Sequence, residues 1–136
     1  MTTMDEISKD GYNGVGMNLV LADNQGNIGY MMCATIPMRK DRTPYIGSRV
    51  LDGTTSAYDW EIGKNVPLAD LPRSFNPERG YIMTANNRQT SDNAKNDYGA
   101  GSMSTARSIR ISEMIEDGIR SGKKLTFEDM SAIQQD

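Results

Sequence analysis

Two apolar runs separated by a short polar sequence are the clearest pattern in the chain. In MNLVLADNQGNIGYMMCAT they flank DNQGN, and Asp, Asn and Gly suit a tight reversal. The pattern predicts a β-hairpin with strands at Met17–Ala22 and Ile28–Ala34. YIMTA predicts a third strand at Tyr81–Ala85.

The remaining pattern predicts a long connection and then helices. Residues 37–76 hold four of the five prolines and only short apolar pieces, which is typical of a loop-rich excursion. A helix is expected from Ser102 to Ser121, with Gly122 at its C-terminal cap. A second helix is expected at LTFEDM, with Thr126 capping and Asp129 completing an approximate capping box. Antiparallel strands followed by C-terminal helices indicate an α+β fold.

An arginine interrupts the apolar face of the first predicted helix. At 100° per residue, Met103, Arg107, Ile111 and Met114 lie in one stripe, where core residues are expected. Arginine is rarely buried unpaired. Either Arg107 is a structural arginine whose head reaches solvent or an ion pair, or its guanidinium points at a site. Helical spacing leaves both open.

Composition narrows the classes of partner. A chain of 136 residues fits one domain, yet only 37% of its residues are hydrophobic, so stability beside other chains or segments is expected. The net charge is −3 and opposite charges are interspersed, which disfavours binding to nucleic acid or an anionic membrane. No apolar run approaches the roughly 20 residues of a membrane helix. The single cysteine, Cys33, excludes an internal disulfide.

The absence of histidine restricts the chemistry. Ser-His-Asp triads, Cys-His pairs and His-based zinc sites cannot form within this chain. An α-amino group can replace histidine as the base for a chain-terminal Ser, Thr or Cys. Thr2 would be such a residue after removal of Met1, but TTMDEISKDG lacks the alternation of a buried strand.

Two adjacent side-chain amides follow the predicted third strand, in GYIMTANNRQ. Asparagine is common in turns because it tolerates positive φ. It is also a neutral hydrogen-bond donor that could stabilise an oxyanion. The ten residues allow Asn86 and Asn87 either role.

Several blocks together resemble the large chain of the penicillin acylase (penicillin amidase) family. They are MNLVLADNQGNIGYMMCATIPMR, YDW, PLADLPRSFNPERGYIMTANNR, ARSIRISEMI and LTFEDMSAIQQD, in order and with similar spacing. The resemblance covers Gly16–Asp136, with residues 1–15 a poorly matched leader, so 1–136 is interpreted as one segment from the middle of that chain. It implies part of the αββα fold of N-terminal nucleophile hydrolases, in an incomplete domain.

The resemblance also implies an activity. Members cleave linear amides, such as the acyl side chains of β-lactams, N-acyl homoserine lactones or other N-acyl compounds, with a serine exposed by self-cleavage. That nucleophile would lie upstream of Met1, so this chain alone would be inactive. The expected partners are the rest of the large chain, the small chain and an N-acyl substrate, with no nucleic acid and no membrane span. A secreted or periplasmic parent is one option that the resemblance offers.

Individual residues carry over from the family motifs. The resemblance puts Asn86 at the oxyanion-hole asparagine, with Asn87 as the turn residue, and Arg107 at an arginine near the site. It puts Met17 on the acyl pocket and Asp97 near a calcium-ligating aspartate, so a structural calcium is expected although no cofactor is needed for the chemistry. QTSDNAKND departs from the family pattern in the calcium region. The alternatives are a non-catalytic structural subunit and a small binding domain that folds alone.

Overall fold

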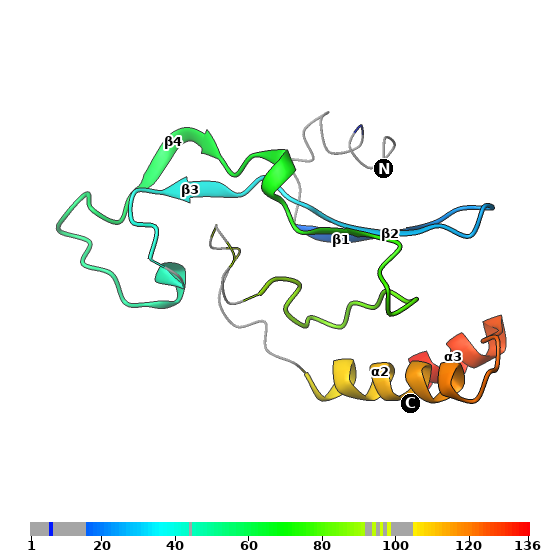
Figure 1. Ribbon diagram of the computed structural model, residues 1–136. Helices are drawn as coiled ribbons and strands as arrows, with labels where there is room; N and C mark the ends of the chain where they lie inside the picture. The colour runs from blue at the N-terminus through cyan, green and yellow to red at the C-terminus, as the bar shows by residue number, and fades with distance from the viewer. Residues whose placement is uncertain are drawn as a thin grey trace. The chain divides into compact units, whose positions relative to one another are not determined.

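The computed structural model describes residues 6, 16–43, 45–91, 94, 96, 98 and 105–136 (Figure 1). They fall into two compact units. The first unit comprises residues 1–82 and 89–101, and the second comprises residues 83–88 and 102–136. Each unit is described by itself.

A three-stranded antiparallel sheet forms the centre of the first unit. Its order is β1 (Met17–Ala22), β2 (Ile28–Cys33) and β5 (Arg73–Phe75). Met17 pairs with Cys33 and Ala22 with Ile28, so the predicted hairpin is confirmed, with its second strand one residue shorter than expected.

Asp23 organises the hairpin turn. Its Oδ1 accepts the backbone N–H groups of Gln25 and Asn27, both at 2.9 Å, and Gly26 supplies a φ of 85°. The side chain of Asn27 donates to the Asp23 carboxylate at 2.7 Å, and this hydrogen bond holds the pKa of Asp23 below its ordinary value. The turn is therefore determined by residues close in sequence.

The core of the first unit joins residues that are far apart in sequence. Met31 on β2 is fully buried and packs with Val66 and Leu71. The half-buried side chains of Leu19 and Leu21 on β1 pack against this cluster. The hydrophobic face of the hairpin is thus covered by the segment that follows β4.

The third strand was predicted in the wrong place. Tyr81–Ala85 has no strand structure, whereas β5 lies within the proline-containing excursion and pairs with β2. Because β1 and β5 pair with the two edges of β2, the backbone of Tyr81–Ala85 cannot pair with that strand.

The excursion is also more ordered than expected. β3 (Pro37–Arg39) and β4 (Trp60–Asn65) form a second antiparallel pair with a bulge between Pro37 and Arg39. Short 3-10 turns occur at Ile46–Ser48 and Leu68–Asp70. Proline limits β3 without preventing it, since a short edge strand tolerates a missing N–H.

The second unit contains two helices, α2 (Ala106–Arg120) and α3 (Phe127–Gln135), which lie side by side (Figure 1). Gly122 has a φ of 75° beyond the end of α2, so the predicted glycine stop is confirmed. The start was predicted too early, because Thr105 is extended and is the N-cap of α2. Ser102 lies outside the described residues.

Glycine is needed where the two helices meet. A Cβ at Gly118 of α2 would lie 2.5 Å from Cδ2 and 3.2 Å from Cγ of Leu125. The missing side chain at position 118 therefore provides the space that Leu125 occupies.

The apolar face of α2 differs from the predicted stripe. Ser108 and Ile115 are buried and Ile111 is half-buried between them, whereas Arg107 is exposed. The arginine therefore does not occupy a core position. Met103, which anchored the predicted stripe, lies outside the described residues.

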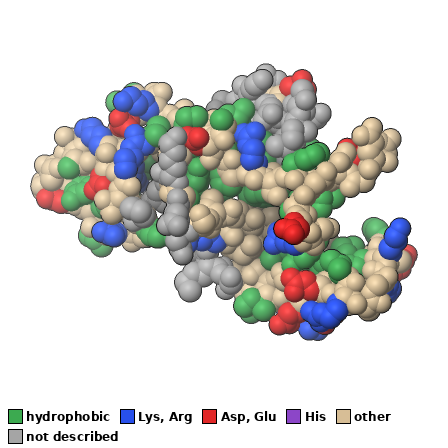
Figure 2. All heavy atoms as spheres, in the orientation of Figure 1, with side chains coloured by type: hydrophobic (Ala, Val, Ile, Leu, Met, Phe, Trp, Pro, Cys, Tyr) green, Lys and Arg blue, Asp and Glu red, His purple; other side chains and the backbone are tan. Residues whose placement is uncertain are grey.

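Acidic and basic side chains are interspersed on the face seen in Figure 2. The described helices include none that is long and apolar enough to cross a membrane.

Candidate oxyanion site

Asn86 lies in a turn with left-handed backbone geometry. Its φ is 60°, whereas Asn87 uses its side-chain Oδ1 to accept the N–H of Ala85 at 2.9 Å. The expectation that Asn87 is the turn residue was therefore wrong in part: Asn86 has the positive φ, and Asn87 supports the turn through its side chain. Asparagine tolerates this conformation better than most residues.

Arg107, in the first turn of α2, binds the same segment. Its Nη2 donates to Oδ1 of Asn86 at 2.5 Å and to the backbone oxygen of Ala85 at 3.4 Å. Arg107 thus contacts Asn86, which lies 21 positions earlier in the chain.

This contact determines which end of the Asn86 amide faces the helix. A guanidinium carries only donors, so the atom that it binds must be the amide oxygen. The Nδ2 group of Asn86 consequently points away from Arg107. Among the described residues, this NH2 group donates to no protein atom, and the Asn86 side chain is exposed.

The resulting site is a fixed, neutral hydrogen-bond donor. An amide has no proton to lose at neutral pH, and it can donate to a developing negative charge without protonating it. The neighbouring guanidinium adds positive charge beside it. The arrangement can therefore stabilise an oxyanion that approaches Nδ2.

Met17 and Asp97 are the two remaining predicted site residues. Met17 opens β1 in the first unit, opposite Cys33, with 56% of its surface exposed. Asp97 lies outside the described residues. Within the described part of the chain, no three His, Cys, Asp or Glu side chains come together as metal ligands. The calcium site stays a prediction.

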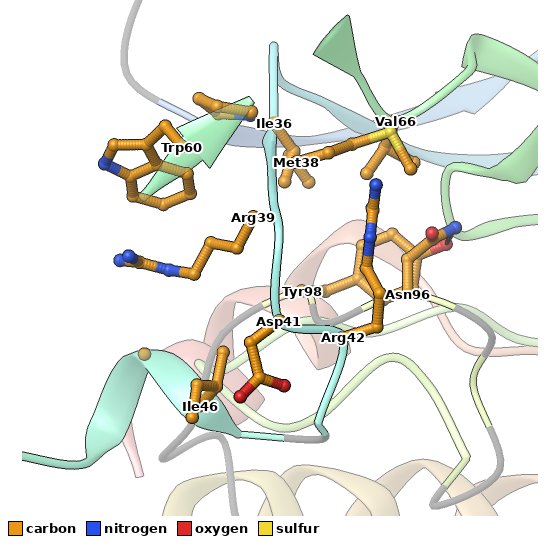
Figure 3. Close-up of a pocket in the computed structure, with 12 residues that line it drawn as sticks. Ile36, Met38, Arg39, Asp41, Arg42, Ile46, Trp60, Val66, Asn96 and Tyr98 are labelled. Carbon is orange, nitrogen blue, oxygen red and sulfur yellow. Dashed lines mark hydrogen bonds between the residues drawn. The ribbon is translucent and has the colours of Figure 1, made fainter. Parts of the chain in front are cut away.

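A cavity of about 260 Å³ lies in the first unit (Figure 3). Ile36, Met38 and Val66 form apolar walls, and the guanidinium of Arg39 lies 3.5 Å from the centre of the Trp60 ring. Its lining includes none of the predicted site residues. The residues that line the cavity therefore do not connect it with the Asn86 amide.

Sequence reasoning missed Thr105. Its hydroxyl donates to the backbone oxygen of Ala85 at 3.0 Å and caps α2 by accepting the N–H of Ser108 at 3.1 Å. Thr followed three positions later by a polar side chain was the available signal for the cap. Nothing local in the sequence indicated the contact with Ala85.

Comparisons with known proteins identify the family of the chain. The family model described as penicillin amidase matches residues 2–136. Over 82 residues the chain is 30% identical to penicillin acylase 2 proenzyme from Pseudomonas sp. (strain SE83), a match that covers 60% of this chain and 10% of that protein.

A solved structure has the same fold over nearly the whole chain. Thermostable penicillin G acylase from Alcaligenes faecalis, in an orthorhombic form, matches with a TM-score of 0.67 and 21% identity. The match covers 98% of this chain and 22% of that one, so the chain spans about a fifth of that relative. The antiparallel strands and two helices form part of the N-terminal nucleophile hydrolase fold. Because the family model extends over residues 2–136, the chain belongs to the penicillin amidase family.

Proposed function

We propose that this chain is part of a hydrolase of linear, non-peptide amides, in which Asn86 donates to the oxyanion and Arg107 positions Asn86. It corresponds in this proposal to a middle portion of the large chain, and a segment outside the sequence carries the nucleophile. The observation that carries the proposal is the hydrogen bond from Arg107 Nη2 to Asn86 Oδ1, which leaves Nδ2 free to act.

Asn86 would act when the nucleophile attacks. The α-amino group of a chain-terminal residue removes the proton from its own hydroxyl or thiol, and the resulting nucleophile adds to the amide carbon. The carbonyl oxygen becomes an oxyanion that accepts a hydrogen bond from Nδ2 of Asn86. The donor is already oriented by Arg107, so little reorganisation is needed as the charge develops.

The family and the names of the relatives support a proposal for the substrate class. Both named relatives are penicillin acylases. We propose an N-acyl compound for this chain, with N-acyl β-lactams as the first substrates to assay. Met17 is proposed as a wall of the acyl pocket, a role that suits a flexible apolar side chain.

Exposed apolar side chains support a need for further polypeptide. Val50, Ile62 and Phe127 are largely exposed, although each is a residue type that is usually buried. The proposed partners are the remainder of the large chain and the small chain.

Asn86→Gly and Asn86→Asp test the donor in the enzyme assembled with its nucleophile-bearing segment. Glycine accepts the φ of 60° and lacks the amide, whereas aspartate retains the contact with Arg107 and, when ionised, cannot donate. Both variants should lower kcat by about 10²–10³, the cost of losing one oxyanion donor. The measurement is amine release from an N-acyl β-lactam.

Asn76→Gly is the matched control, because Asn76 also has a positive φ, of 45°. Its side chain binds the hairpin at Ile28 and Asn27, so its loss should affect stability and leave kcat unchanged. Turnover near the wild-type value in both Asn86 variants would refute the oxyanion role. A companion segment without Ser, Thr or Cys at the start of a strand would favour a structural subunit instead.

A further inference from the structure

We infer that Thr105 is a positioning residue for the Asn86 amide, which it holds through the peptide group that precedes Asn86. The inference rests on the proposed function. It assigns to this threonine a second role beyond capping α2.

The Thr105 hydroxyl both donates and accepts a hydrogen bond. The O–H donates to the Ala85 carbonyl oxygen at 3.0 Å, and the oxygen accepts the Ser108 N–H at 3.1 Å. The backbone N–H of Thr105 in turn donates to Oγ of Ser108 at 2.9 Å, and Ser108 is buried. The hydroxyl is therefore held by the helix on one side while it holds Ala85 on the other.

The hydrogen bond from Thr105 acts on the peptide group that joins Ala85 to Asn86. The Ala85 carbonyl and the Asn86 nitrogen belong to one planar peptide group. A hydrogen bond to that carbonyl therefore restricts the rotation that sets the φ of Asn86. Ala85 is 4% exposed, and its N–H is bound by Oδ1 of Asn87, so the plane ahead of it is restrained as well.

Arg107 and Thr105 both hold the segment at Asn86. Arg107 binds the side-chain oxygen of Asn86 and, at 3.4 Å, the Ala85 carbonyl, while Thr105 binds that carbonyl at 3.0 Å. The two side chains lie in the same helix turn, so their positions are linked by the helix. Together they fix where Nδ2 lies, and small displacements of a catalytic group have large effects on rate.

The second helix offers a matched comparison. Thr126 caps α3 with the same capping-box arrangement, accepting the Asp129 N–H at 3.3 Å. Within the described part of the protein, Thr126 makes no hydrogen bond to the segment of residues 85–87. Thr126→Val thus removes a comparable cap without removing the contact with Ala85.

The test compares Thr105→Val, Thr105→Ser and Thr126→Val in the assembled enzyme. Valine keeps the shape of threonine without its hydroxyl. Thr105→Val should lower kcat by roughly 10- to 100-fold with KM little changed, because the donor is displaced rather than the substrate contacts. Thr105→Ser, which keeps the hydroxyl, and Thr126→Val should both have kcat close to the wild-type value.

A second measurement separates positioning from general loss of structure. If Thr105 acts through Asn86, Thr105→Val should lower kcat no further in an Asn86→Gly background. An equal loss in both backgrounds, or a loss of kcat in Thr126→Val as large as in Thr105→Val, would overturn the inference. A large effect of Asn86→Gly with none of Thr105→Val would also overturn it while leaving the proposed function intact. No effect of Asn86→Gly refutes the proposed function itself.

Discussion

Asn86 combines a backbone requirement with a chemical one. Its φ of 60° favours glycine, asparagine or aspartate, and of these only asparagine brings an amide donor. The two interpretations of the asparagine pair, turn and donor, therefore apply to one residue. One asparagine can thus meet both the positive φ of the turn and the proposed need for a neutral donor.

Arg107 orients Asn86 because a guanidinium has donors only. Arg107→Lys keeps that property with one compact donor group, whereas Arg107→Gln can bind either end of the amide. We expect kcat to fall in the order wild type, Arg107→Lys, Arg107→Gln. A hydrogen bond from a charged donor contributes about 1.5–3 kcal/mol, so the glutamine variant should lose about 10- to 100-fold.

Steady-state kinetics on the assembled enzyme measures this order. Turnover of Arg107→Gln equal to or above that of Arg107→Lys would contradict the orienting role. Arg107→Lys keeps the positive charge, so it is the control for the loss of charge in Arg107→Gln.

At the scale of elements, local capping determined where both helices begin. Thr105 and Thr126 each accept a backbone N–H three residues later. The position of α3 was predictable because its threonine is followed by two acidic residues and precedes the apolar pattern directly. α2 was extended too far because Ser102, also a good capping residue, lies just ahead of the true cap.

Acid should weaken the start of α3. Hydrogen bonds from Lys123 and from the Thr126 N–H hold the pKa of Asp129 below its ordinary value of 3.8. A depressed pKa in the folded state stabilises the fold above pH 3.8, and this contribution is lost as the pH falls through the folded-state pKa.

Asp129→Asn tests this dependence. The wild type should be more stable than the variant at neutral pH, and the difference should vanish below pH 3.8. Urea denaturation followed by helical circular dichroism at several pH values measures it. A difference that is independent of pH would show that the carboxylate charge contributes nothing.

At the scale of the whole molecule, each of the two units buries apolar side chains of its own. In the first, Met31 of the hairpin comes together with Val66 and Leu71 of the long excursion, so this core depends on contacts between distant residues. In the second, Ile115 of α2 and Ile133 of α3 are the buried apolar positions of the two helices. Figure 1 shows the strands of the first unit and the helices α2 and α3 of the second.

Met31→Ala should destabilise the first unit by about 2–5 kcal/mol, because it opens a cavity at a fully buried position. Met17→Ala is the control at an exposed position of the same sheet and should change stability by no more than about 0.5 kcal/mol. Trp60 is the only tryptophan and belongs to the first unit, so its fluorescence during urea denaturation reports on that unit. Equal midpoints for the two variants would show that Met31 is not central to the core.

The predictable part of the fold was the part with local causes. The hairpin follows from Asp23, Gly26 and Asn27, which lie within five residues of one another. β5 was missed because Arg73–Phe75 is short and contains a single apolar residue, and its strand structure depends on pairing with the edge of β2 that β1 leaves open. Tyr81–Ala85 consists of strand-forming residues but has no strand structure, in line with the dependence of strand propensity on its surroundings.

The sequence by itself determined the hairpin, the Thr126 cap of α3, the glycine that ends α2 and the exclusion of histidine-based chemistry, and it carried the family resemblance that the comparisons confirmed. Those features depend on residue types or on neighbours a few positions apart. Only the tertiary structure decided that Asn86 has the positive φ, that its oxygen faces Arg107, and that Thr105 binds Ala85. These contacts join residues about twenty positions apart, and the orientation of an amide depends on what lies opposite each of its ends.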